Sequence, residues 1–233
     1  MKLKIKQKVL MEHLNYVIRG ISNKNLIPIL NCIKFELNDE GLYLLSTDNE
    51  LAIKSFIPKE KIEEIEIQGE LLISGRYIYD IVKRLDNEII NIEEIIDSQV
   101  LITTANSSFK LNCNNVNEFP DLDLEFTNTP ILIDQKIFKT TINQTIFAAS
   151  NQESRPILTG INFKVNNNLM EVTATDSYRL SKKRITLDTA VEDNIDIIIP
   201  SRNVNEITKL MLDDEEKCEM HIFTNKVIFK IKK

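Results

Sequence analysis

The sequence predicts an α+β protein built from two tandem copies of one domain, each with two helices packed on antiparallel sheet. The first observation is a repeat: Asn23–Leu30 returns as Asn151–Leu158, and Thr47-Asp48 returns as Thr175-Asp176, both 128 positions later. The second observation is that helical and strand periodicities follow one another in the same order in both copies. A repeat of this length is a complete folding unit, so we expect domains over 1–128 and 129–233.

Each copy contains two segments in which apolar residues recur at helical spacing. An opening strand over residues 1–6 precedes the first helical stripe, which comprises Val9, Leu10, Leu14, Val17, Ile18 and Ile21. Residues 137–149 repeat that stripe at the same offset. The second helix has its stripe over 78–85 in the first copy and 204–211 in the second, at an offset of 126. A short segment that contains an arginine, Arg76 or Arg202, comes directly before each of these second stripes.

Strands are predicted between and after these helices. In the first copy they cover 29–37, 41–47, 52–57, 88–92, 100–104 and 108–111. In the second copy they cover 156–165, 169–175, 179–185, 219–223 and 227–231. This order favours a layer of two helices against antiparallel sheet in each copy.

Composition narrows the class of function. The three cysteines (Cys32, Cys113 and Cys218) form no Cys-x-x-Cys pair, so we expect reduced thiols, no metal site and no cofactor. The opening residues lack the apolar core of a signal peptide, and no apolar run could span a bilayer, which predicts a cytoplasmic protein. A net charge of −6 counts against nucleic acid, but binding depends on where the cations lie rather than on their sum.

An enzyme is disfavoured, and we expect no catalytic residues. The two histidines, His13 and His221, fall in unrelated elements, and no Gly-rich phosphate loop, Gly-x-Ser-x-Gly or His-Glu-x-x-His motif occurs. Asp48 and Asp176 are not a carboxylate pair, because each occupies the same turn of its own copy and the two lie one domain apart. Binding is therefore the expected activity.

Several motifs together resemble the bacterial sliding clamp, the beta subunit of DNA polymerase III. They are Pro28-Ile29-Leu30, Leu45-Ser46-Thr47-Asp48, Phe119-Pro120-Asp121, Arg155-Pro156-Ile157-Leu158-Thr159-Gly160-Ile161 and Ala174-Thr175-Asp176-Ser177-Tyr178-Arg179-Leu180-Ser181. The match is collinear over essentially the whole chain. The resemblance implies a processivity factor that tethers polymerase to its template and slides along duplex DNA without reading sequence, in the cytoplasm at the nucleoid.

The resemblance also implies which residues face DNA, because in this family the helices line the hole of a ring. The implied DNA-binding residues are Arg19, Lys24, Arg76, Lys83, Lys136, Lys139, Gln152 and Arg202. Lys24 lies in the loop where the family places a DNA-contacting basic residue, and Gln152 is its repeat mate. Tyr77 stands where many relatives carry a basic residue, which counts against a contact there. The alternative for each cation is a solvated helix face.

A second implied site is a peptide-binding pocket that accepts a short, mostly apolar linear motif from the polymerase III catalytic subunit, the clamp loader and repair proteins. Its residues here are Leu158, Thr175, Ser177, Tyr178, Arg179 and Leu180. The alternative is that these leucines are core residues and Thr175-Asp176 only makes a turn. We favour the pocket because the matching first-copy residues, Asn49-Glu50-Leu51-Ala52, are acidic and lack the Tyr-Arg-Leu run.

Two further expectations follow from the resemblance. The family has three such domains per subunit and forms a homodimeric ring, whereas this chain matches the first domain and most of the second. We therefore expect a truncated form without ring closure and with half of each peptide site. The rival function is a peptide-binding adaptor with no DNA role, which salt-dependent DNA affinity would distinguish.

Overall fold

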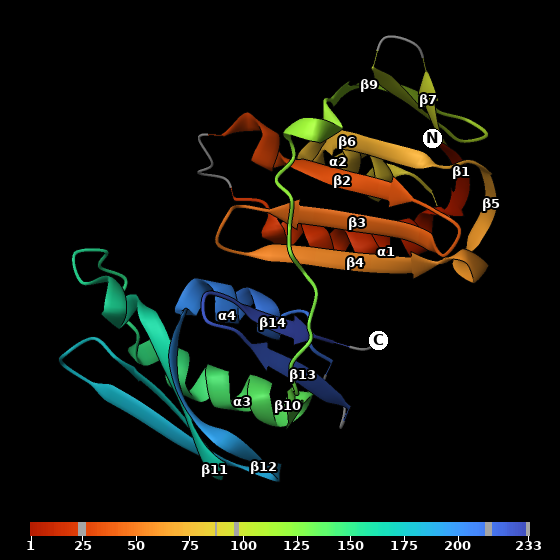
Figure 1. The fold of residues 1–233 in the computed structure, drawn as a ribbon. Coiled ribbons are helices and arrows are strands. Elements are labelled where there is room, and N and C mark those ends of the chain that lie inside the picture. The colour runs from red at the N-terminus through yellow and green to blue at the C-terminus, as the bar shows by residue number, and fades with distance from the viewer. Residues whose placement is uncertain (23–26, 87, 96–97, 213–215, 232–233) are drawn as a thin grey trace. The chain divides into compact units, whose positions relative to one another are not determined.

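The computed structural model describes residues 1–22, 27–86, 88–95, 98–212 and 216–231, apart from the side chain of Asp193. The chain divides into two compact units, Met1–Leu122 and Asp123–Lys233 (Figure 1). Residues 123–128, which the repeat spacing assigns to the first copy, contact the second unit: the Asn128 side-chain amide donates to the Ile222 carbonyl over 2.7 Å.

Unit 1 contains one antiparallel sheet covered by two helices. The helices are α1 (Gln7–Val17) and α2 (Gly75–Arg84). The strands are β1 (Lys2–Lys6), β2 (Cys32–Leu37), β3 (Gly41–Thr47), β4 (Ala52–Pro58), β5 (Ile62–Ile67), β6 (Gly69–Ser74), β7 (Ile89–Ile95), β8 (Gln99–Thr103) and β9 (Ser108–Asn114). Their order across the sheet is β4-β3-β2-β6-β9-β8-β7-β1-β5. The helices lie on the same side of the β2–β3–β4 strands, where Leu10, Leu14 and Val17 are fully buried (Figure 1).

Unit 2 repeats this plan with fewer strands, two of which, β11 and β12, are much longer than those of unit 1. Its helices are α3 (Gln135–Thr145) and α4 (Ser201–Thr208). Its strands are β10 (Ile131–Asp134), β11 (Gly160–Thr175), β12 (Leu180–Pro200), β13 (Lys217–Ile222) and β14 (Val227–Lys230), arranged as sheets β10-β13-β14 and β11-β12. The core forms around Phe138, whose ring centroid lies 6.1 Å from that of Phe163 and 5.5 Å from that of Phe229.

Backbone pairing confirms that the copies share one fold. Ile5 pairs with Ile90 across β1 and β7, and the residues 128 positions later, Ile133 and Cys218, pair across β10 and β13. The hydrogen bond that precedes the first helix is also conserved between the copies. The Gln7 amide donates to the Glu88 carbonyl over 2.9 Å, and the Gln135 amide donates to the Glu216 carbonyl over 3.0 Å.

Several predicted boundaries need correction. The strands expected from 29 and from 156 begin later, at Cys32 and Gly160, because 3-10 turns occupy Pro28–Asn31 and Pro156–Thr159. Proline has no amide hydrogen for a sheet ladder and suits the first position of such turns. The second-copy strands expected over 156–165 and 169–175 are joined in one strand, β11, which crosses a register shift around Asn167.

Strands β5, β6 and β10 were not predicted, and the strand expected over 179–185 continues to residue 200 as β12. The β5 sequence Ile-Glu-Glu-Ile-Glu-Ile is dense in carboxylates, and this composition disfavours a strand. The strand pairs along its backbone with β1, which supplies facing lysines: Lys2 pairs with Glu66 at 2.8 Å and Lys6 with Glu63 at 2.9 Å. A lysine on every second residue of β1 thus compensates the acidic run of its neighbour.

Candidate DNA-binding faces and peptide-binding surface

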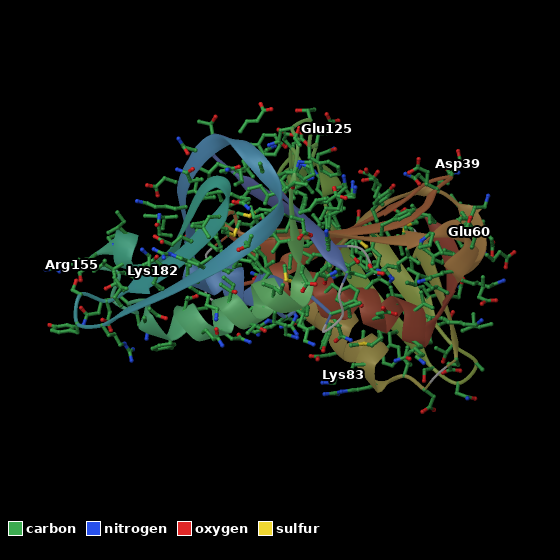
Figure 2. All side chains as sticks on the ribbon, turned by 90° about the horizontal axis from the view of Figure 1, so that it is seen from below. Asp39, Glu60, Lys83, Glu125, Arg155 and Lys182 are labelled. Carbon is green, nitrogen blue, oxygen red and sulfur yellow. The ribbon has the colours of Figure 1, made fainter. Side chains whose placement is uncertain are left out.

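The predicted DNA-binding residues of unit 1 lie on or beside its helices. Arg19 is half-buried in the 3-10 turn Ile18–Gly20 that extends α1. Arg76 and Lys83 are exposed at opposite ends of α2, and the Lys83 ammonium lies 5.7 Å from the centroid of the Tyr79 ring. Figure 2 shows Lys83 projecting from the helical side of this unit, whereas Asp39 and Glu60 lie at the ends of its strands. Lys24 lies outside the described residues.

The predicted residues of unit 2 occupy its helices and one loop. Lys136 is exposed and Lys139 half-buried on α3, and Arg202 is exposed in the first turn of α4. Gln152 is exposed in the loop that leads to the 3-10 turn before β11, where its backbone N–H donates to the Ser150 hydroxyl over 3.0 Å.

A pattern that the sequence analysis missed unites these helices. Each of the four described α-helices carries a cation as its second residue, and none has an acidic residue in its first turn. These cations are Lys8, Arg76, Lys136 and Arg202. The helix macrodipole favours carboxylates at this end, so a cation there costs about 0.3–1 kcal/mol. Cations at these positions do not stabilise the helices, but they are well placed to bind an anion outside the protein. The signal for Lys8 was available, since Lys136 lies 128 positions later.

Five of the six predicted peptide-binding residues lie at the turn between β11 and β12, and the sixth, Leu158, lies in the 3-10 turn Pro156–Thr159. The Asp176 carboxylate accepts from the amides of Tyr178 and Arg179, each over 3.0 Å, and Ser177 adopts the left-handed conformation at φ 77°. The amides of Arg179 and Tyr178 hold the pKa of the Asp176 carboxyl below its ordinary value, with the Arg179 guanidinium adding to the effect. The Thr175 hydroxyl closes the turn by donating to the Arg179 carbonyl over 2.7 Å.

The first copy contains the same turn with different side chains. Asp48 accepts from the amides of Glu50 and Leu51 over 3.2 and 2.9 Å, and Asn49 has a φ of 75°. The backbone geometry therefore cannot account for the Tyr178-Arg179-Leu180 run. Thr175-Asp176 makes a turn, as the alternative interpretation expected, and this turn presents three side chains that its first-copy counterpart lacks.

Apolar side chains are unusually exposed around this turn. Tyr178 is 98% exposed and Leu180 64%, and two residues that the sequence analysis did not select, Ile157 and Phe147, are 66% and 57% exposed. The Arg179 guanidinium lies 5.6 Å from the centroid of the Phe147 ring, which draws that ring to the turn. Leu158 is half-buried, and its carbonyl accepts from the Ser150 amide over 2.8 Å. We call Phe147, Ile157, Tyr178, Arg179 and Leu180 the apolar surface.

Arg155 adds a second cation near this turn. Its guanidinium contacts the Ser177 hydroxyl at 3.5 Å, and Figure 2 shows it at one extremity of unit 2. The surface thus combines apolar side chains with two arginines, a composition suited to a short peptide that carries apolar residues and an acidic group or terminal carboxylate.

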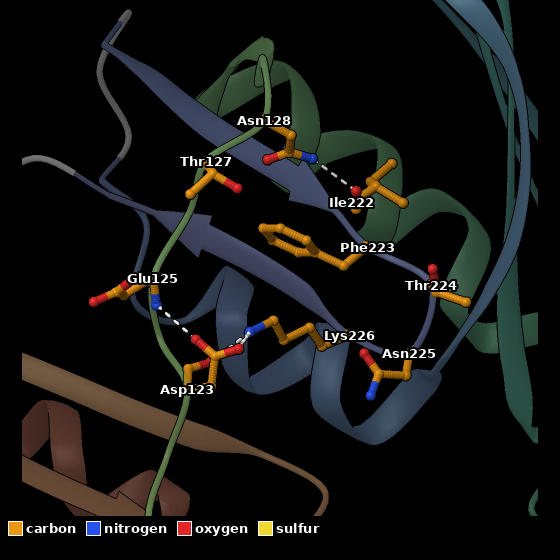
Figure 3. Close-up of a pocket in the computed structure, with 9 residues that line it drawn as sticks. All are labelled: Asp123, Glu125, Thr127, Asn128, Ile222, Phe223, Thr224, Asn225 and Lys226. Atoms are coloured by element: carbon orange, nitrogen blue, oxygen red, sulfur yellow. Dashed lines mark hydrogen bonds and ion pairs between the residues drawn. The ribbon is translucent and has the colours of Figure 1, made fainter.

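A hollow of about 610 Å3 elsewhere in unit 2 serves the fold instead (Figure 3). It lies where residues 123–128 run beside the turn between β13 and β14. The Lys226 ammonium pairs with the Asp123 carboxylate at 2.5 Å, and this contact lowers the pKa of that carboxyl. These contacts hold segment 123–128 against the β13–β14 hairpin.

The remaining reactive side chains also have structural surroundings. Cys32 and Cys218 are buried, and desolvation raises the pKa of the Cys218 thiol to about 11. The His13 ring nitrogen Nδ1 lies 2.8 Å from the Ser55 hydroxyl. Among the described residues, His, Cys, Asp and Glu form no cluster that could hold a metal ion. No helix in that part of the chain is long and apolar enough to cross a membrane.

Comparison with known proteins identifies the family. Residues 1–123 match the N-terminal domain of the DNA polymerase III beta subunit, and residues 132–233 match its central domain. The chain is 33% identical to the beta sliding clamp of Streptococcus pneumoniae over 230 residues, and 34% identical to that of Bacillus subtilis over 236 residues. The fold and these matches define a tandem-domain DNA clamp. The chain belongs to the DNA polymerase III beta subunit family.

Solved structures agree with this assignment. A crystal structure of the DNA polymerase sliding clamp from Bacillus subtilis matches with a TM-score of 0.94 and 33% identity over 99% of the chain. The beta chain of Streptococcus pneumoniae DNA polymerase III matches with a TM-score of 0.93. The chain spans 61% of the length of the Streptococcus pneumoniae relative and 62% of the Bacillus subtilis one.

Proposed function

We propose that this chain provides two domains of a DNA polymerase processivity factor. The protein holds duplex DNA without sequence preference and tethers polymerase and other partners to it. The observation that carries the DNA part is the cation at the second position of every described α-helix, in a protein whose net charge is −6. Contacts of this kind bind phosphates rather than bases, so they hold DNA while allowing movement along it.

The acidic residues fit the same proposal, because many of them are neutralised away from the helices. On β5 and β1, Glu64 and Lys4 pair at 2.5 Å, and on β11 and β12, Glu171 pairs with Lys182 and Arg184. Pairing of these carboxylates within the strand layer reduces the negative potential that opposes an anion at the helices. In this proposal Arg19, Lys139, Arg202 and Gln152 contribute to the same contact.

The apolar surface is the proposed docking site for partner proteins. Its exposed side chains suit a short linear motif, such as one from the polymerase III catalytic subunit, the clamp loader or a repair protein. We also propose that the complete protein closes into a homodimeric ring, has no catalytic activity of its own, and resides in the cytoplasm at the nucleoid.

Salt-dependent binding to two unrelated linear duplexes tests the DNA part. We expect Arg76→Glu and Lys136→Glu to weaken binding to both duplexes equally. Each should flatten the dependence of log K on log salt by about 0.9 for every phosphate that the protein no longer neutralises. Lys59→Glu is the matched control, since Lys59 is exposed in the 3-10 turn Lys59–Lys61, between β4 and β5. DNA binding that is independent of salt and unchanged by Arg76→Glu and Lys136→Glu would favour the peptide-binding adaptor instead.

A further inference from the structure

Two tyrosines on α2 have opposite surroundings. Tyr79 is half-buried, and its hydroxyl donates to the Asn15 side chain on α1 over 2.9 Å. Tyr77 is 65% exposed, and among the described residues its hydroxyl has no hydrogen-bond partner and its ring has no aromatic or cationic contact. Tyr79 therefore has a structural role in joining α2 to α1, whereas the side chain of Tyr77 has no such role.

The neighbours of Tyr77 indicate the charge of whatever contacts it. Ile78 and Val82 are fully buried, so the opposite side of α2 faces outward. That outward side presents three exposed cations, Arg76, Lys83 and Arg84, and one exposed carboxylate, Asp80. A tyrosine is amphipathic: its ring packs against apolar groups and its hydroxyl donates a hydrogen bond. Because Tyr77 lies among cations, the partner that fits this side of α2 is anionic and has an apolar surface beside its charged groups.

We propose that Tyr77 is an uncharged contact to the DNA backbone, with its hydroxyl donating to a phosphate oxygen and its ring lying against the adjacent deoxyribose. This inference rests on the proposed DNA-binding function. The sequence analysis counted Tyr77, which replaces a basic residue of many relatives, against a DNA contact at this position, and the inference is the opposite. Because the phenol is neutral, the contact adds affinity without releasing a counterion, and because it reads no base edge, it is compatible with sliding.

Binding to a linear duplex at several salt concentrations separates this contact from an ionic one. We expect Tyr77→Phe to weaken binding by about two- to tenfold at every salt concentration, the loss of one hydrogen bond, with an unchanged slope of log K against log salt. Tyr77→Lys should steepen that slope by about 0.9, because it adds one counterion-releasing contact. Tyr79→Phe, two residues away, should lower the midpoint of thermal unfolding and leave DNA affinity unchanged.

Arg76→Gln distinguishes a failure of this inference from a failure of the proposed function. If Arg76→Gln flattens the salt dependence while Tyr77→Phe binds like the wild type, the DNA-binding proposal stands and the Tyr77 contact is wrong. A slope altered by Tyr77→Phe would also overturn the contact, since a neutral group releases no counterion. If neither Arg76→Gln nor Tyr77→Phe changes binding, both proposals fall.

Discussion

At the scale of single residues, the repeat separates what a turn needs from what a binding surface needs. Asp48 and Asp176 accept equivalent amide hydrogen bonds, and Asn49 and Ser177 share the left-handed conformation. Aspartate at the first position and a small polar residue at the second are common turn chemistry, and sequence alone predicted them. The exposure of Phe147 was not predictable, because Phe147 lies beside a buried stripe and reaches the turn only through tertiary contact with Arg179.

The exposed tyrosine of the apolar surface provides the first prediction. Tyr178→Ala should weaken binding of a short apolar clamp-binding peptide by tenfold or more, since about 1.4 kcal/mol corresponds to tenfold and aromatic anchors commonly exceed that value. Fluorescence anisotropy with a labelled peptide measures the affinity. Glu50→Ala changes the matching residue of the first copy and should leave peptide affinity unchanged. Equal affinities for wild type and Tyr178→Ala would place the peptide elsewhere.

The second prediction concerns acid. The pKa of the Asp176 carboxyl is lower in the folded protein than in the unfolded chain. Such a group stabilises the fold above its unfolded pKa, and this contribution disappears as the pH falls through its folded pKa. The difference in unfolding free energy between wild type and Asp176→Ala should therefore be largest near neutral pH and shrink in acid. Urea titrations at a series of pH values measure it, and a difference that stays constant into strong acid would contradict the ionic role.

At the scale of elements, helices were predictable and strand limits were less so. The stripes at 9–21 and 137–149 correspond to α1 and α3 together with the 3-10 turns that follow them. They were recognisable because an apolar period of 3.6 needs no distant partner. Strand β5 pairs along its backbone with β1, where Lys2, Lys4 and Lys6 face its carboxylates, and this pairing joins segments about sixty residues apart. The exposed residues around the β11–β12 turn followed the same rule: the turn itself was predicted from local sequence, whereas Phe147 comes from a separate segment and was missed.

The third prediction uses the two ends of α2. Arg76→Glu should stabilise the fold by about 0.3–1 kcal/mol, because a carboxylate in the first turn favours the helix dipole, while it weakens DNA binding. Lys83→Glu, in the last turn of the same helix, should destabilise the fold and also weaken DNA binding. Urea unfolding and duplex binding on the same samples give both quantities. A decrease in stability in Arg76→Glu would contradict the idea that this cation is retained for an external anion.

At the scale of the whole molecule, each unit has its own core. Leu10 and Phe138 are equivalent residues at the 128-residue spacing, and both are fully buried. Phe138 contacts Phe163 and Phe229, all within unit 2, whereas Leu10 belongs to α1 of unit 1. Each unit therefore buries a complete set of apolar side chains, as expected of a domain rather than of a solenoid repeat.

Local stability provides the fourth prediction. Phe138→Ala should destabilise unit 2 by about 3–5 kcal/mol, because it removes a fully buried aromatic side chain and leaves a cavity. Hydrogen exchange should show the loss of protection in α3 and β11. Leu10→Ala should produce the reciprocal pattern, with the loss in α1 and β4. Uniform loss of protection along the chain in either variant would show that the units do not retain separate stability.

The number of residues that separates equivalent elements of the two copies changes along the chain, and this change shows where the fold tolerates a different chain length. The spacing is 128 residues up to β4 and β12, 126 residues at the start of α2 and α4, and 128 again at the strands that follow. The first copy thus has two extra residues around the turn Lys59–Lys61 and the β5 strand, while the hydrogen-bonded framework on either side is conserved. For protein engineering, this makes the turn after β4 a place of natural length variation, and a label inserted there would leave both helix faces and the apolar surface unaltered.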